Sequence, residues 1–373
     1  MLIGVPREIK VHEYRVGMTP ASVREAVLRG HGVLVQSGAG IGIGCDDAAY
    51  VSAGAQIAST ATEVFARADM MVKVKEPQPV ECAMLREGQI LFTFLHLAPD
   101  LQQARLLQQS GCTAIAYETV TDALGGLPLL APMSEVAGRM AIQVGAICLQ
   151  KASGGRGVLL GGVPGVAPGH AVILGGGIAG TQAARMAVGI GADVTILDKS
   201  LPRLRYLDDM FGGRVRTLYS TAHAVEEATQ LADLVIGAVL IPGAAAPRLI
   251  RREQLARLRP GAVLVDISID QGGCFESSKA TTHQDPTYDV DGIVHYCVAN
   301  MPGAVPRTST FALNDATLPY ILALADKGGE RACREDPHLA AGLNVRAGEI
   351  TCQMVAEALG LPYREPTTFL AAG

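Results

Sequence analysis

The chain has 373 residues, of which 49% are hydrophobic and 18% are charged, with 43 glycines and no tryptophan. The length suits two domains, and the composition is typical of a compact α/β protein rather than a disordered or fibrous one. The net charge of −5 gives no reason to expect a nucleic acid or an anionic membrane as a partner.

The eight cysteines are scattered without a Cys-x-x-Cys pair, so we expect reduced thiols, no disulfide framework and no metal site. No segment approaches the roughly 18 apolar residues that a membrane span requires. The first residues, MLIGVPREIK, contain no long apolar run either. A cytoplasmic enzyme is therefore the expected class.

Short apolar segments alternate with helical patterns in the first third of the chain. The strand-like segments are LIGVP, GVLVQSG, DMMVKVK, QILFTFLH and CTAIAYE, and helix-like stretches lie at 19–29, 59–68 and 100–109. Alternation of this kind predicts a parallel sheet covered by helices.

A helical pattern, SEVAGRMAIQVGAICLQKA, and a glycine-rich connector lead into a second α/β run. Its strand-like segments are HAVILGGG, GADVTILD, RVRTLYS, ADLVIGAVL, GAVLVDIS and IVHYCVAN. The helix-like stretches at 312–328 and 348–359 have no predicted strands of their own to cover, so we expect them to return to the first domain. The sequence thus predicts two doubly wound α/β domains, a discontinuous one of residues 1–131 and 302–373 and a continuous one of residues 132–301.

The strongest motif lies at the start of the second run. A strand enters Gly175-x-Gly177-x-x-Gly180, a helix follows, and the next strand ends at Asp198. Glycines at these positions permit a tight turn and let the backbone approach a pyrophosphate, while the helix N-terminus supplies N–H donors. Asp198 would bond the adenosine ribose and repel a 2′-phosphate, so the motif predicts a Rossmann domain that binds NAD. Nearby cations leave NADP open, and a turn that only packs helix on strand is the alternative.

Polar residues follow several predicted strands. Lys75 and His96 end two strands of the first domain, and Arg15 lies in the turn after its first strand. Because the carboxyl ends of parallel strands share one edge, we expect these residues to bind a small anionic substrate, with His96 transferring protons. Taken singly, each has an ordinary explanation as a solvated strand end, a core histidine or a surface ion pair. Asp270, just beyond a later strand, lies near the expected nicotinamide ring unless it only caps a Gly-Gly turn.

Over essentially its whole length, the sequence resembles the NAD-dependent L-alanine dehydrogenase family. Matching segments include GVPREIKVHEYRVGMTP, VKVKEPQP, LFTFLHLA, APMSEVAGRMA, DLVIGAVLIPGA, DQGGCFE and HYCVANMPGAVPRTST. The resemblance implies that Arg15 and Lys75 bind the substrate and that His96 and Asp270 divide the acid–base roles between them. It also implies a homohexamer. The NAD contacts that it implies are Ser134, Ile178, Ala179, Asp198, Arg203, Ser220, Val239, Leu240, Ile267, Lys279, Val298, Ala299, Asn300 and Met301.

The activity implied by this resemblance is the reversible oxidative deamination of L-alanine to pyruvate and ammonia, with hydride transfer to NAD. The sequence is more weakly similar to the soluble NAD-binding part of nicotinamide nucleotide transhydrogenase, so hydride transfer between two nucleotides is one alternative. A non-catalytic NAD-binding protein is another, although such a scaffold has no need of Arg15, Lys75, His96 and Asp270 together.

Overall fold

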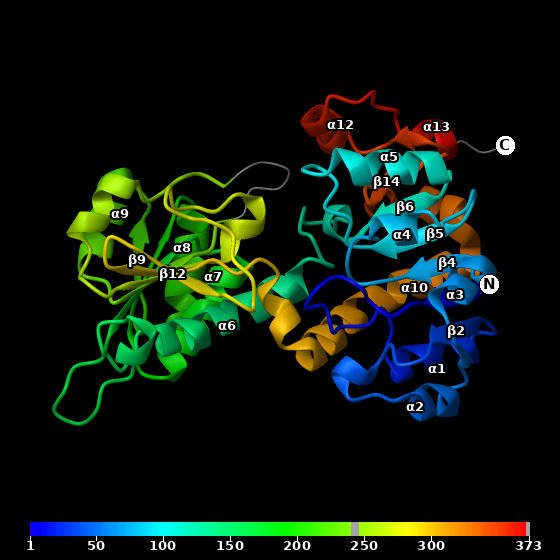
Figure 1. Cartoon of the computed structure of the whole chain (residues 1–373). Coiled ribbons are helices and arrows are strands. Elements are labelled where there is room, and N and C mark those ends of the chain that lie inside the picture. The colour runs from blue at the N-terminus through cyan, green and yellow to red at the C-terminus, as the bar shows by residue number, and fades with distance from the viewer. Residues whose placement is uncertain (240–245, 371–373) are drawn as a thin grey trace. The chain divides into compact units, whose positions relative to one another are not determined.

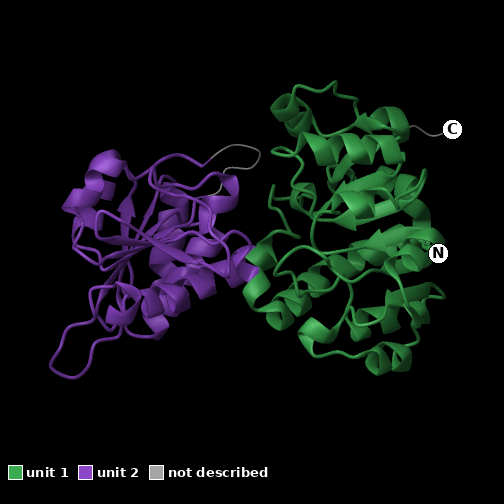
Figure 2. Cartoon of the chain, viewed as in Figure 1, with its two compact units in different colours: residues 1–133, 303–373 green, residues 134–302 purple. Residues whose placement is uncertain are grey.

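The computed structural model describes residues 1–239 and 246–370, and the chain divides into two compact units. Unit 1 comprises Met1–Met133 and Gly303–Gly373, and unit 2 comprises Ser134–Pro302 (Figure 2). Each unit is built on one mostly parallel sheet, which confirms the predicted α/β fold class. No helix among the described residues is long and apolar enough to cross a membrane.

The sheet of unit 1 has eight strands in the order β15-β14-β6-β5-β4-β1-β2-β3. Strands β1 to β6 are parallel, whereas β14 pairs antiparallel with both β6 and β15. The strands are β1 (Leu2–Val5), β2 (Gly32–Gln36), β3 (Gln56–Ala58), β4 (Met70–Val72), β5 (Ile90–Thr93), β6 (Thr113–Ala116), β14 (Leu343–Arg346) and β15 (Glu349–Ile350). The expectation that the C-terminal segment has no strands is wrong, because β14 and β15 extend the N-terminal sheet (Figure 1).

The helices of unit 1 lie on both faces of this sheet, so β4 is buried on both sides: Met70, Met71 and Val72 are all inaccessible to solvent. Several helices begin at a side chain that accepts a backbone N–H, as Thr19, Thr60 and Asp100 do for α1, α3 and α5. The helices are α1 (Pro20–Leu28), α2 (Asp47–Ser52), α3 (Ala61–Arg67), α4 (Pro79–Cys82), α5 (Leu101–Ser110), α10 (Pro306–Glu335), α11 (Pro337–Ala340), α12 (Gln353–Leu359) and α13 (Thr367–Leu370).

Unit 2 has a seven-stranded sheet in the order β12-β13-β11-β10-β7-β8-β9, in which only β12 is antiparallel among the described strands. The strands are β7 (His170–Leu174), β8 (Asp193–Asp198), β9 (Arg216–Tyr219), β10 (Leu234–Gly237), β11 (Val263–Asp266), β12 (Thr287–Val290) and β13 (Ile293–Tyr296). The helices are α7 (Ile178–Gly189), α8 (Leu201–Phe211), α9 (Ala222–Gln230) and α6 (Ala131–Cys148), which starts in unit 1.

The two sheets share one winding order. Counted within each unit, the six parallel strands lie in the order 3-2-1-4-5-6, as β3-β2-β1-β4-β5-β6 and as β9-β8-β7-β10-β11-β13. In such sheets, ligands bind beyond the carboxyl ends of the strands where the winding direction reverses. That point lies between β1 and β4 in unit 1 and between β7 and β10 in unit 2.

Candidate active site

The three proposed substrate residues of unit 1 all follow strands at this reversal point. Arg15 lies in the loop after β1, and Lys75 and His96 each come three residues after the end of β4 and β5. β4 pairs with β1 on one side and with β5 on the other. Gly17 brings the Arg15 loop against β4, because a Cβ there would lie 2.2 Å from the carbonyl oxygen of Val72. The fold therefore places all three segments at one sheet edge.

The Arg15 guanidinium is buried and held by Glu13. Its Nε donates to Glu13 Oε1 at 2.7 Å and its Nη2 donates to Oε2 at 2.5 Å, while Nη1 donates to Met133 Sδ at 3.1 Å. The backbone N–H of Arg15 also donates to Glu13 Oε1 at 3.0 Å. A bidentate ion pair of this kind fixes the plane of the guanidinium. The orientation of Arg15 is thus set before any ligand arrives.

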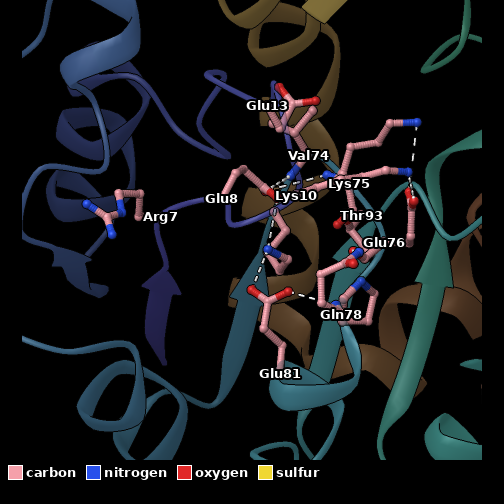
Figure 3. A network of polar contacts seen from close by, with 12 residues as sticks. Arg7, Glu8, Lys10, Glu13, Val74, Lys75, Glu76, Gln78, Glu81 and Thr93 are labelled. Atoms are coloured by element: carbon pink, nitrogen blue, oxygen red, sulfur yellow. Dashed lines mark hydrogen bonds and ion pairs between the residues drawn. The ribbon is translucent and has the colours of Figure 1, made fainter. Parts of the chain in front are cut away.

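The Lys75 ammonium is buried but only loosely paired. Its ion-pair partner is Glu76, whose Oε2 lies 3.8 Å from Lys75 Nζ, too far for a hydrogen bond (Figure 3). Glu76 also pairs with Lys10 through its other oxygen. Within the described residues, Lys75 Nζ donates no hydrogen bond to the protein. Its N–H groups are therefore available to an anion.

The His96 imidazole lies among cations. Burial lowers the pKa of His96 well below its ordinary value, and the charges of Lys75, Lys10 and Arg15 lower it further. The ring stacks on Phe94, with the ring centroids 5.7 Å apart and the planes 5° from parallel. His96 is accordingly neutral at neutral pH and able to accept a proton.

A buried carboxylate holds the backbone of His96. Glu118, just after β6, accepts the N–H of His96 at 2.6 Å and the N–H of Leu95 at 3.2 Å. His96 has a φ of +49°, in the left-handed region that few non-glycine residues adopt. Burial raises the pKa of Glu118, and the N–H groups of His96 and Leu95 oppose that rise.

The glycine-rich turn of unit 2 forms a cradle that fits a pyrophosphate. Gly175 has a φ of +103°, and a Cβ there would lie 2.5 Å from the Ala238 carbonyl oxygen. A Cβ on Gly180 would lie 1.8 Å from the Gly175 carbonyl oxygen, so both positions require glycine. Gly177 begins α7 without a side-chain cap, and a Cβ on it would meet nothing within 4 Å. The backbone at the start of α7 can therefore be approached closely, as an anion site requires.

Asp198 and Arg203 are both tied to this turn. Asp198 Oδ2 accepts the N–H of Gly176 at 2.7 Å, and its Oδ1 accepts the N–H of Ser200 at 2.8 Å. Arg203 Nε donates to the Gly176 carbonyl oxygen at 2.5 Å, and its Nη2 donates to Thr181 Oγ1 at 2.6 Å. The carboxylate at the end of β8 is thus held against the glycine-rich turn, and the Arg203 guanidinium is occupied by hydrogen bonds within the protein.

Asp270 is exposed in the short helix η5 (Ile267–Gln271) after β11. The buried Asp266 begins η5 and accepts the N–H groups of Ser268 at 3.0 Å and Cys274 at 2.9 Å. Ser268 Oγ in turn donates to the Val239 carbonyl oxygen at 2.7 Å. These bonds connect the loops after β10 and β11 and fix the turn that carries Asp270.

Most of the other predicted cofactor residues also lie at the carboxyl edge of this sheet. Ser220 follows β9, Val239 follows β10, Ile267 follows β11, and Val298 to Met301 follow β13, whereas Ser134 lies in α6 and Lys279 in an exposed loop. Asn300 has a φ of +63°, and its carbonyl oxygen accepts from His283 Nε2 at 3.1 Å. The predicted contact Leu240 lies outside the described residues. No group of three or more His, Cys, Asp and Glu side chains suited to a metal ion occurs among the residues described.

The sequence interpretation did not single out the acidic residues that hold these segments. They are Glu8, Glu13, Glu81, Glu118 and Asp266, and all but Glu118 have at most a tenth of their surface exposed. Glu8 and Glu118 come shortly after a parallel strand, as the predicted cations do, and Asp266 is the last residue of one. The same strand-end rule, applied to both signs of charge, would have found these three.

Comparison with known proteins places the whole chain in one family. The family described as "Alanine dehydrogenase/PNT, N-terminal domain" matches residues 4–137, and "Alanine dehydrogenase/PNT, C-terminal domain" matches residues 141–353. The alanine dehydrogenase of Halomonas elongata is 59% identical over 370 residues, covering 99% of this chain and 100% of that protein. The alanine dehydrogenase of Bacillus subtilis is 53% identical over 364 residues, covering 97% and 96% of the two chains.

Solved structures of similar proteins support the same family. A structure of "L-alanine dehydrogenase" superposes with a TM-score of 0.93 at 52% identity, covering 96% of this chain and 99% of the other. A transhydrogenase from Sinorhizobium meliloti has a TM-score of 0.80 at 23% identity, covering 95% and 99%, which shows a shared fold. With both halves matched and full-length relatives above half identity, the chain belongs to the alanine dehydrogenase/PNT family.

Proposed function

We propose that the chain catalyses the reversible oxidative deamination of L-alanine to pyruvate and ammonia, with NAD as the hydride acceptor. The observation that carries this proposal is the arrangement at the carboxyl edge of unit 1. A fixed guanidinium, a loosely paired ammonium and a neutral imidazole follow β1, β4 and β5 there. A small anion with one carboxylate and one reacting nitrogen or oxygen suits that set.

Arg15 and Lys75 bind the substrate in this proposal. The planar guanidinium is suited to a carboxylate, because two N–H groups can bond its two oxygens. Lys75 is a compact donor that binds the same carboxylate or the carbonyl oxygen of pyruvate. The charge of both groups also favours the anionic substrate over a neutral amine, since the surrounding side chains are buried.

His96 and Asp270 move protons. In its neutral form, His96 accepts a proton from the alanine ammonium group or from the water that attacks the iminium carbon. In the reverse direction, the protonated ring donates to the carbonyl oxygen of pyruvate. Asp270 orients the attacking water or takes its proton, and the division of these two roles stays open.

The residues of unit 2 hold the cofactor in this proposal. NAD, when bound, supplies the acceptor for the hydride that leaves the alanine Cα. The glycines and the N-terminus of α7 would hold its pyrophosphate, and Asp198 would accept from its ribose hydroxyls. The loops after β9, β10, β11 and β13 would supply the remaining contacts, from Ser220, Val239, Leu240, Ile267 and Val298 to Met301. Ser134, Ile178, Ala179, Arg203 and Lys279 complete the proposed set.

A direct assay tests the proposal. The purified chain is mixed with L-alanine and NAD, and NADH formation is followed by absorbance; pyruvate, ammonia and NADH test the reverse direction. The transhydrogenase alternative predicts no signal in either mixture, but hydride transfer from NADH to a spectrally distinct NAD analogue. A non-catalytic protein gives no signal in any of the three, although it still binds NADH. The family resemblance also supports a homohexamer, which light scattering after gel filtration would measure.

A further inference from the structure

A network of three charged side chains is buried beside Lys75. Lys73 Nζ donates to Glu8 Oε2 at 3.0 Å and to Glu81 Oε1 at 2.7 Å. The Lys73 side chain is 0% exposed, and those of Glu8 and Glu81 are 2% exposed. Burial of this kind costs free energy, and a buried ion pair is often no more stabilising than apolar residues of similar volume. The network therefore needs an explanation other than stability.

The second oxygen of Glu8 gives that explanation. Glu8 Oε1 accepts the N–H of Val74 at 2.7 Å and the N–H of Lys75 at 3.4 Å (Figure 3). Glu8 lies three residues after the end of β1, and Lys75 lies three residues after the end of β4. One carboxylate thus connects the two loops at the point where the sheet reverses its winding. Arg7, the neighbour of Glu8 in sequence, points away from the network in Figure 3.

The hydrogen bonds of residues 73–75 show why this carboxylate is needed. β4 ends at Val72, and beyond it the pairing with the β5 segment continues only through the Lys73 N–H, which donates to the Phe92 carbonyl oxygen at 3.2 Å, and the Val74 carbonyl oxygen, which accepts from the Phe94 N–H at 3.3 Å. Tyr117 Oη donates to the Lys73 carbonyl oxygen and Thr93 Oγ1 donates to that of Lys75, each at 3.0 Å. The N–H groups of Val74 and Lys75 have Glu8 as their acceptor within the described residues. Because buried N–H groups are costly when unpaired, Glu8 completes the segment that carries Lys75.

We propose that Glu8 is a positioning residue, which fixes the backbone of Lys75 while the Lys73 ammonium holds the Glu8 carboxylate in place. The claim that this positioning serves substrate binding rests on the proposed function. The anchoring of the Lys75 backbone by Glu8 does not depend on it. Glu8 need not touch the substrate, because it sets the direction of the Lys75 side chain through the two N–H groups.

Three variants separate this role from general stability. Glu8→Ala removes the acceptor for Val74 and Lys75. Glu8→Gln keeps an acceptor oxygen and leaves Lys73 and Glu81 as a neutral pair. Glu81→Ala is the matched control: it also removes one partner of Lys73, but Glu81 Oε2 accepts the N–H of Gln78 at 2.8 Å, not those of residues 74–75.

The first measurement is hydrogen–deuterium exchange by mass spectrometry, with overlapping peptides that separate residues 73–76 from 77–80. Glu8→Ala should speed exchange in 73–76 on the order of tenfold, as expected for the loss of one or two hydrogen bonds. Glu81→Ala should speed exchange at Gln78 instead, and Glu8→Gln should resemble the wild type. Unchanged exchange at 73–76 in Glu8→Ala, or an equal increase there in Glu81→Ala, would overturn the proposal whether or not the chain oxidises alanine.

The second measurement is steady-state kinetics with pyruvate. Glu8→Ala should raise the pyruvate KM by about 10- to 100-fold, the effect of a misplaced binding group, with NADH affinity unchanged. Glu8→Gln should restore the KM to near the wild-type value, and Glu81→Ala should not raise it. Equal KM values in Glu8→Ala and Glu81→Ala would contradict the positioning role. Absence of wild-type turnover would contradict the proposed function alone, because the exchange measurement still decides the anchoring.

Discussion

The backbone N–H of His96 donates to Glu118 Oε1 at 2.6 Å, although His96 and Glu118 follow different strands. His96 lies in the left-handed region with a φ of +49°, a conformation that costs a non-glycine residue about 1–3 kcal/mol. The same carboxylate accepts the N–H of Leu95. The Glu118 carboxylate therefore stabilises the backbone conformation that orients the His96 imidazole.

Replacing Glu118 should separate the placement of His96 from cofactor binding. Glu118→Ala leaves the N–H groups of Leu95 and His96 without their acceptor, so the free energy of unfolding should fall by about 1–3 kcal/mol. The kcat should also fall, because His96 can relax from φ +49°, while the Kd for NADH should not change. Denaturant unfolding, steady-state kinetics and fluorescence titration measure the three quantities. Glu118→Gln, which keeps an acceptor oxygen, should lose less of both stability and kcat. A kcat as high in Glu118→Ala as in the wild type would contradict this account.

The pH dependence of the reaction should report the cations around His96. Burial and the charges of Lys75, Lys10 and Arg15 lower the pKa of His96, so in the free enzyme the active neutral form persists well below pH 6.5. The acid limb of kcat/KM for alanine should therefore lie below that pH, since kcat/KM reports the free enzyme. A bound carboxylate offsets the cations and raises the pKa of His96 in the complex. The acid limb of kcat should accordingly lie at higher pH than that of kcat/KM.

Lys10 provides the control for this argument, because it has no proposed contact with substrate. Lys10→Met removes a charge that lowers the pKa of His96 and also takes from Glu76 its nearer ion-pair partner, leaving the Lys75 ammonium at 3.8 Å. Both changes favour the protonated ring. The acid limb of kcat/KM should move to higher pH, and an unmoved limb would show that a group other than His96 titrates there.

Lys73 should be far more costly to remove than an exposed lysine. Lys73→Met leaves Glu8 and Glu81 buried without a counter-charge, a loss of about 3–5 kcal/mol in the free energy of unfolding. Burial already raises the pKa of Glu8, and Lys73 opposes that rise. Without Lys73 the folded-state pKa rises further above the unfolded one, so the folded state binds more protons and loses stability as pH rises. Denaturant unfolding should show a smaller difference from the wild type at about pH 5 than at about pH 8.

The triple variant Lys73→Met, Glu8→Gln, Glu81→Gln tests the cause of that loss. It removes the uncompensated charges, so it should recover much of the stability that Lys73→Met alone loses. If the triple variant were as unstable as the single one, packing of the Lys73 stem rather than its charge would be the reason.

Much of the fold was predictable because its signals are local. Apolar segments alternating with helical patterns indicated both sheets, and the glycine-rich turn was recognisable because a strand precedes it and a helix follows. β14 and β15 were missed because LNVR and EI are too short and too polar to show a strand pattern. Their strand character depends on pairing with β6 and with each other, which no local window contains.

The polar part of the site was less predictable, because its partners are distant in sequence. Alternation placed Lys73 on the face opposite Val72 and Val74, yet all three are buried, since both faces of the sheet are covered. The counter-charge that makes a buried Lys73 possible comes partly from Glu8, 65 residues earlier. Strand ends indicated where Lys75 and His96 lie, but only the folded chain shows which carboxylates hold them.

Lys75 should be required for turnover and not for cofactor binding. Its ammonium lies in unit 1, and it donates no hydrogen bond within the described residues, so its removal breaks little inside the protein. Lys75→Ala should abolish alanine oxidation and pyruvate reduction while the Kd for NADH stays within about twofold of the wild type, as expected when the removed group contacts the substrate and not the cofactor. Fluorescence titration with NADH measures the Kd. A comparable loss of NADH affinity would contradict the assignment of Lys75 to the substrate.

Asp198 should decide between NAD and NADP through its charge. Its carboxylate is fixed at the end of β8 by the N–H groups of Gly176 and Ser200. In the proposed cofactor site, a 2′-phosphate would lie against this carboxylate. One unit charge at 4 Å is worth roughly 1–4 kcal/mol near a protein surface, so removing it should raise the ratio of kcat/KM for NADP to that for NAD by about tenfold or more. Asp198→Asn keeps an acceptor for the turn, whereas Asp198→Ala also loosens Gly176. If charge is the cause, both variants shift the ratio and only Asp198→Ala weakens binding of both cofactors. If neither variant changes this ratio, Asp198 does not face the ribose. Arg203 would not explain the cofactor preference either, because its guanidinium already donates to the glycine-rich turn and to Thr181.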